Sequence, residues 1–179
     1  MDKRLRRIPY TSAVWKEWVA LEAAGLVPGA KPFLDTARDR GVAMYFVTNR
    51  SIDDEAHTVA NLHALGIPAS AEAVMCVGEN GWTWDKTARR QLIASTHRIV
   101  MLLGDDLNDF IPAKLTSERR VAEAEKHSAW WGSRSFVLPN PTYGSSERAL
   151  TATSRRCPTA RSCSASSPRY AVSTTDEAR

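Results

Sequence analysis

The sequence lacks the features by which several classes of protein are recognised. It has three cysteines, Cys76, Cys157 and Cys163, and their spacing fits neither a metal site nor a disulfide framework. No apolar run approaches the roughly 20 residues that a membrane-spanning helix needs. The basic start of the chain is not followed by the apolar segment of a signal peptide. As written, the sequence therefore predicts a cytoplasmic thiol protein that does not enter a membrane.

Positive charge is too scattered to predict a nucleic-acid partner. The formal net charge is +4, but residues 1–150 carry 19 Lys and Arg against 18 Asp and Glu, whereas residues 151–179 carry five against two. A nearly neutral body with basic ends lacks the basic stripe that binding along a phosphate backbone requires. No Gly-x-x-x-x-Gly-Lys-Ser/Thr loop is present either, so the DEAH tetrapeptide at 54–57 is not interpreted as a helicase box.

Apolar periodicity predicts helices that alternate with strands. Helices are expected over residues 12–25, 30–40, 53–66, 87–96 and 116–127. Ser12 is the predicted cap of the first helix and Gly25 its predicted end. Continuous apolar runs, typical of buried strands, occur at 42–47, 73–78, 99–103 and 135–140. This alternation predicts an α/β fold with a mainly parallel sheet, because parallel strands are joined by crossover helices.

The composition changes sharply after Leu150. In residues 151–179, 11 of 29 residues are Ser or Thr, and large apolar residues are almost absent. Such a segment cannot bury enough apolar area to offset the cost of ordering, so this tail is expected to be disordered. Its composition also resembles the product of a reading-frame shift in GC-rich DNA. The chain is thus divided into a basic segment (1–11), a domain (12–150) and a tail (151–179).

Reactive side chains follow two of the predicted strands. Thr48 and Asn49 follow one apolar run, Asp105 and Asp109 follow another, and Lys86 starts the helix between them. Ligands of open parallel sheets bind beyond the carboxyl ends of the strands. A hydroxyl and an ammonium suit phosphate oxygens, and carboxylates suit a hard cation such as Mg²⁺. These residue types therefore suit a phosphoryl group held beside a hard cation.

Four segments, in order, resemble a known family. They are PGAKPFLDTARDRGVAMYFVTNRS, DKTARR, GDDLNDF and VLPNPTYGS. Together they resemble the acid phosphatase branch of the haloacid dehalogenase (HAD) superfamily, especially bacterial lipoprotein acid phosphatases and 5′-nucleotidases, over residues 12–150. The resemblance implies a Rossmann-like fold, Mg²⁺ as cofactor, a small phosphate monoester such as a nucleotide as substrate, and hydrolysis through an aspartyl-phosphate. Family members are usually secreted or lipid-anchored, so a missing N-terminal signal is the alternative to a cytoplasmic location.

The resemblance also assigns a role to each matching residue. Thr48 and Asn49 would bind the transferring phosphate, and Lys86 would stabilise that phosphate and the nucleophile. Asp105 would ligate Mg²⁺, and Asp109 would support the metal site. The resemblance also implies that Thr48 and Asp105 lie at the carboxyl ends of neighbouring parallel strands, with Lys86 pointing into the same cleft. The family's Asp-x-Asp-x-Thr motif, which carries the nucleophile and the general acid/base, does not occur in the sequence. We therefore expect a HAD fold that lacks its first core strand and is inactive as written; the alternative is a non-catalytic remnant that binds phosphate or metal.

Each of these residues has a simpler interpretation when it is taken alone. Thr48 could be a helix N-cap, Lys86 a solvated lysine, Asp105 a turn residue and Asp109 a cap. Asp106, between the last two, is interpreted as a surface acid. The four segments together favour a phosphate site over these interpretations.

Overall fold

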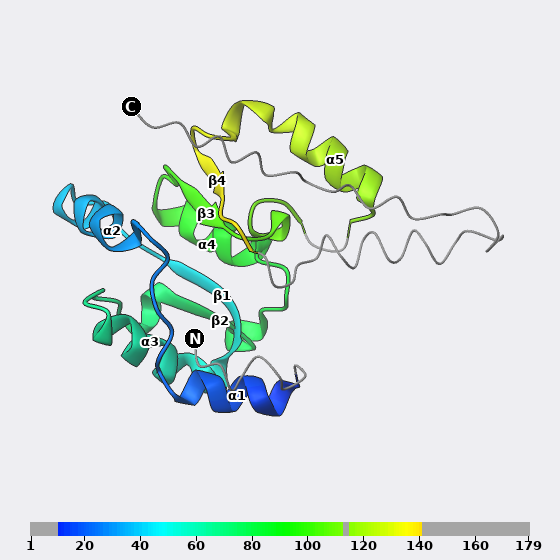
Figure 1. Ribbon diagram of the computed structural model, residues 1–179. Coiled ribbons are helices and arrows are strands. Elements are labelled where there is room, and N and C mark those ends of the chain that lie inside the picture. Colours follow the sequence, from blue (N-terminus) through cyan, green and yellow to red (C-terminus); the bar gives the residue numbers. More distant parts are fainter. Residues whose placement is uncertain (1–10, 113–114, 141–179) are drawn as a thin grey trace, which may run out of the picture.

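The computed structural model describes residues 11–112 and 115–140 (Figure 1). The helices are α1 (Ser12–Ala20), α2 (Ala30–Asp39), α3 (Glu55–Ala64), α4 (Thr87–Thr96) and α5 (Ser117–Lys126). The strands are β1 (Phe46–Ser51), β2 (Val74–Val77), β3 (Leu102–Gly104) and β4 (Ser135–Val137). The predicted α/β alternation is therefore observed. The expectations for the basic segment up to residue 10 and for the tail lie outside the described residues.

The strands form two parallel pairs, β1 with β2 and β3 with β4. Figure 1 shows the first pair in the lower half of the molecule with α1 and α3, and the second in the upper half with α5. Parallel pairing confirms the fold class. The expectation that the strands carrying Thr48 and Asp105 are neighbours is wrong for the described residues, because β1 and β3 belong to separate sheets. No described strand joins these two sheets.

β1 begins and ends later than the apolar run at 42–47 predicts. It spans Phe46–Ser51, and its pairing with β2 begins where Phe46 lies opposite Val74. Hydrogen bonding to a partner, rather than side-chain polarity, sets the limits of a strand. Thr48 and Asn49 consequently lie within β1, where the register is irregular, instead of following it.

Helix capping explains where α1 begins. Thr11, not Ser12, is the N-cap of α1, because Thr11 has the extended backbone of a cap and its hydroxyl accepts a hydrogen bond from the Val14 N–H at 3.2 Å. α1 also ends at Ala20, earlier than the predicted stop at Gly25. By contrast, α4 occupies the predicted range 87–96. Within the described ranges, no helix is long and apolar enough to cross a bilayer.

The core of the lower half lies between β2 and α3. Val74 and Cys76 of β2 are fully buried and cluster with Ala69. Val59 and Leu62 of α3 pack against this cluster. Burial, with the nearby charges of two glutamates, raises the pKa of the Cys76 thiol to about 11. This thiol is therefore a packing group, since the thiolate is the reactive form.

Candidate active site

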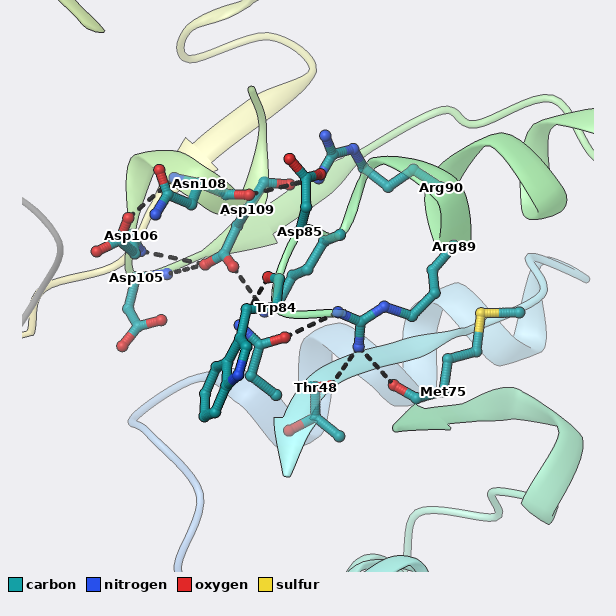
Figure 2. A network of polar contacts seen from close by, with 12 residues as sticks. Thr48, Met75, Trp84, Asp85, Arg89, Arg90, Asp105, Asp106, Asn108 and Asp109 are labelled. Carbon is teal, nitrogen blue, oxygen red and sulfur yellow. Dashed lines mark hydrogen bonds and ion pairs between the residues drawn. The ribbon is translucent and has the colours of Figure 1, made fainter. Parts of the chain in front are cut away.

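The segment that leads into α4 contacts β1. The side-chain amide of Asn49 donates from Nδ2 to the Trp84 carbonyl at 3.2 Å, and its Oδ1 accepts a hydrogen bond from Arg89 Nη2 at 2.8 Å. Arg89 Nη1 also donates to the main-chain carbonyl of Thr48 (Figure 2). The Asn49 side chain is thus engaged at both ends by the protein, and it ties β1 to the start of α4.

Thr48 keeps a hydroxyl that can serve a ligand. Its Oγ1 accepts a hydrogen bond from the Arg50 N–H at 3.2 Å. A threonine hydroxyl also carries a hydrogen of its own to donate, so this contact leaves the donor unused. Thr48 can therefore donate to a phosphate oxygen while its position is fixed by the backbone.

On its other side, the start of α4 contacts the turn that follows β3. Lys86 Nζ lies 2.6 Å from Asp109 Oδ1, and the two side chains are 16% and 12% exposed. Asp109 Oδ2 accepts hydrogen bonds from the backbone N–H groups of Asp105 and Asp106, at 3.0 and 3.1 Å. Lys86 is therefore not a solvated lysine, and both oxygens of Asp109 are used inside the protein.

Asp106 is not the surface acid that the sequence suggests. Its side chain is 20% exposed and lies 3.5 Å from the Arg120 guanidinium of α5, which is itself 10% exposed. Asp106 Oδ1 also accepts from the Asn108 N–H at 2.9 Å, and Asp109 completes a reciprocal capping box. Distant packing of α5 against this turn, which the local sequence does not show, covers the carboxylate.

Asp105 is the exposed carboxylate of the turn. Its Oδ2 accepts a hydrogen bond from Asn140 Nδ2 at 2.6 Å. Of the two predicted metal residues, Asp105 can therefore offer an oxygen to a cation, whereas Asp109 is already paired with Lys86. Across residues 11–112 and 115–140, no group of three or more His, Cys, Asp or Glu is placed to hold a metal ion. These residues fit one ligand of a metal centre and do not fit a complete centre.

Two arginines of α4 were not predicted to belong to the site. Arg89 is fully buried, and Arg90 Nη1 donates to the Asp109 carbonyl at 2.9 Å. Burial lowers the pKa of both guanidinium groups below the usual value. The sequence did contain a signal, because Arg89 lies four residues before Ile93, and the two side chains share the buried face of α4. A charged residue is almost never fully buried unless it is paired, so an arginine on this face predicts polar partners inside the protein.

Comparison with known proteins identifies the family of this chain. A family model described as HAD superfamily, subfamily IIIB (acid phosphatase), matches residues 1–146. The chain belongs to this family. The assignment confirms the resemblance that the four sequence segments indicated. Acid phosphatases of the HAD superfamily generally use a divalent metal ion.

Two solved structures of a class C acid phosphatase share this fold. The class C acid phosphatase from Bacillus anthracis is 29% identical, with a TM-score of 0.73 over 80% of this chain and 60% of that chain. Its tungstate-bound structure gives a TM-score of 0.74 at the same identity and coverage. These matches confirm a HAD-like α/β fold.

Two curated plant proteins are also similar. The stem 28 kDa and stem 31 kDa glycoproteins of Glycine max are 24% and 25% identical over 139 and 138 residues. The matches cover 75% of this chain in each case, and 49% and 48% of the relatives. The chain therefore spans about half the length of the curated relatives that it matches.

Proposed function

We propose that this chain recognises phosphate monoesters, nucleotides among them, as part of a Mg²⁺-dependent acid phosphatase of the 5′-nucleotidase type. The observation that carries the proposal is the bridge formed by residues 83–90. This bridge holds β1, which bears Thr48, and the turn after β3, which bears Asp105, through side-chain contacts to both. The chemical groups suited to a phosphate monoester are thereby fixed in one network.

Phosphate recognition follows from the donors of this network. Thr48 has a hydroxyl hydrogen to give, and the ammonium of Lys86 has three N–H donors, of which the bond to Asp109 uses one. The buried guanidinium of Arg89 adds positive charge close to Thr48. Positive groups in a partly water-excluded site attract a phosphate dianion more strongly than they would in water. The tungstate bound by the Bacillus anthracis relative is a tetrahedral oxyanion like phosphate, which supports the same ligand class.

The metal would be held in part by Asp105. When bound, Mg²⁺ supplies positive charge that polarises the phosphoryl group and offsets negative charge in the transition state. The exposed Asp105 carboxylate is the described oxygen ligand suited to it, and further ligands are required to complete the octahedral coordination that Mg²⁺ prefers.

Turnover through an aspartyl-phosphate needs an attacking carboxylate. The sequence has no Asp-x-Asp-x-Thr motif, and in the turn after β3 the Asp106 and Asp109 carboxylates are paired with Arg120 and Lys86. Because both carboxylates are already paired, these contacts favour a second candidate function for the chain as written. This function is phosphate binding without hydrolysis. Thr48 and Lys86 would position the phosphate.

Binding can be tested with the 179-residue chain and inorganic phosphate, followed by calorimetry or ³¹P NMR. We expect saturable binding that Thr48→Val weakens by about tenfold, the effect of one hydrogen bond to a charged group. The matched control is Thr36→Val on the exposed surface of α2, where the hydroxyl bonds the Pro32 carbonyl within its own helix. Equal affinity in Thr48→Val and the parent chain would contradict the proposal.

Turnover is tested separately with p-nitrophenyl phosphate and Mg²⁺. The chain as written should be no faster than its Thr48→Val, Asp105→Asn variant, because removing a nucleophile costs several orders of magnitude in rate. An N-terminal extension that supplies a strand and Asp-x-Asp-x-Thr should produce Mg²⁺-dependent hydrolysis, with adenosine 5′-monophosphate as a competing substrate. Mg²⁺-dependent hydrolysis by the unextended chain, lost in Asp105→Asn, would overturn the non-catalytic assignment.

A further inference from the structure

We propose that Arg89 is a positioning residue, which holds the phosphate-binding part of β1 in register with the start of α4. The proposal rests on the proposed function, since it concerns how the same site is built. Arg89 does not itself contact the phosphate in this scheme; it acts through Asn49 and the backbone of Thr48.

The guanidinium of Arg89 joins four acceptors from three parts of the chain. Nη1 donates to the Thr48 carbonyl of β1 and to the Met75 carbonyl of β2, the latter at 3.2 Å. Nη2 donates to Asn49 Oδ1 at 2.8 Å and to the Thr83 carbonyl at 3.0 Å. Figure 2 shows the Arg89 side chain reaching from α4 toward Thr48 and Met75. One side chain therefore fixes two strands and the segment before Lys86.

Full burial makes this arrangement costly to leave incomplete. All four acceptors are neutral oxygens, and Arg89 Nε is buried without a hydrogen-bond partner among the described residues. A buried cation whose donors lose their acceptors would have a large desolvation penalty. The planar fork of a guanidinium can serve several acceptors at once, whereas a lysine ammonium is a point charge on a flexible stem. Lysine at this position would retain the charge and lose the geometry.

Arg89 affects the ligand site through the orientation of the Asn49 side chain. Because Oδ1 faces Arg89, Nδ2 is left to donate to the Trp84 carbonyl, two residues before Lys86. Without Arg89, the amide can rotate and the contact between β1 and the segment before Lys86 is lost. The Thr48 hydroxyl and the Lys86 ammonium would then no longer be held at a fixed separation, and phosphate affinity would fall.

The test is a double-mutant cycle on the full chain, with inorganic phosphate as the probe. Arg89→Lys and Asn49→Ala should each weaken binding by about tenfold, and the double variant should weaken it little further, because both changes break one connection. The matched control is Asn61→Ala, which removes another buried side chain that bonds the main chain, here Ala24 N and O. Asn61→Ala should lower the thermal midpoint and leave phosphate affinity unchanged.

A second measurement follows the Asn49 side-chain amide by ¹H–¹⁵N NMR. The N–H proton that bonds the Trp84 carbonyl should exchange more slowly in the parent chain than in Arg89→Lys, while amides of α3 stay equally protected in both. If the parent chain binds phosphate and Thr48→Val weakens that binding, but Arg89→Lys behaves like Asn61→Ala, the role of Arg89 is overturned alone. If the parent chain binds no phosphate, the proposed function is overturned, and the positioning role with it.

Discussion

Three carboxylates share the turn after β3, and each has a different environment. Asp105 is exposed, Asp106 lies against Arg120, and Asp109 is paired with Lys86. Two cations and several backbone N–H groups thus offset much of the negative charge at the end of this strand. A divalent ion is not needed to hold the turn together, although Asp105 remains suited to ligate one.

This difference predicts unequal effects of two similar substitutions. Asp109→Asn should lower the free energy of unfolding by about 2–4 kcal/mol, because it leaves the largely buried Lys86 ammonium without a counter-charge. Asp105→Asn should leave stability nearly unchanged. Urea unfolding followed by tryptophan fluorescence measures both. Equal losses in the two variants would show that Asp109 is no more structural than Asp105.

Residue roles were the least predictable part of the molecule. The sequence pointed to Thr48 and Asp105 through their positions after apolar runs, and to Lys86 through its place at the start of a helix. It did not show that Asp109 is paired with Lys86, or that Arg89 reaches Thr48, because these contacts span 23 and 41 positions. Local patterns specify which face of an element is apolar, but they do not specify which distant group reaches it.

The strand β3 ends at Gly104, where the side chain of Asp109 fills the space beside the backbone. A Cβ built on Gly104 would overlap the Asp109 side chain. The close approach lets the Asp109 carboxylate reach the backbone N–H groups of the following turn. Glycine is needed at this position for space, since its φ is not in the left-handed region.

Gly104→Ala should therefore displace Asp109 and destabilise the protein by about 1–3 kcal/mol, the usual cost of an overpacked site. It should also weaken phosphate binding, because Lys86 would lose its partner. Gly25→Ala is the control, since no atom lies within 4 Å of a Cβ at that position. Thermal unfolding compares the two variants. A Gly104→Ala protein as stable as Gly25→Ala would show that the turn adjusts without cost.

The limits of an element were predicted well where they depend on the local sequence, and poorly where they depend on pairing with a distant strand. α4 was predicted over its full range, because the apolar periodicity of this segment is a local signal. β1 lies later in the sequence than predicted, because its pairing with β2 sets its limits. The prediction of parallel strands held, but the division into two sheets depends on which strands are present to pair and could not be deduced from periodicity.

For the whole molecule, the two strand pairs are joined through α4 and its side chains. The lower pair has its own buried cluster around Cys76, and Lys86 and Arg90 reach the upper half from α4. Opening of the lower pair would expose the Cys76 thiol to solvent. Its chemical reactivity therefore reports on the folding of this half.

Cys76 should be alkylated by iodoacetamide very slowly in the folded protein. With a pKa of about 11, its thiolate fraction at pH 8 is roughly a hundredfold below that of a free thiol. Mass spectrometry of a Cys157→Ser, Cys163→Ser protein isolates this reaction. Labelling at the rate of a free thiol at pH 8, with the fold intact by circular dichroism, would contradict the burial of Cys76.

The same shift has a defined effect on stability. The folded-state pKa of about 11 lies above the ordinary value of 9.0, so the unfolded chain loses the thiol proton first. The contribution of Cys76 is therefore full below about pH 9 and declines as the pH rises toward 11. Urea unfolding at a series of alkaline pH values should show this decline, and Cys76→Ala should lack it.

The contacts of Arg89 are also expected to form late in folding. They connect α4 to Met75, 14 positions earlier, and to Thr48, 41 positions earlier. Such distant partners meet after local structure has formed, because closing the intervening loops costs entropy before any contact is gained. Arg89→Lys should therefore accelerate unfolding in stopped-flow experiments and leave the refolding rate almost unchanged, a φ-value near zero. We therefore expect the contacts of the buried guanidinium to form late in folding and to prolong the lifetime of the folded state.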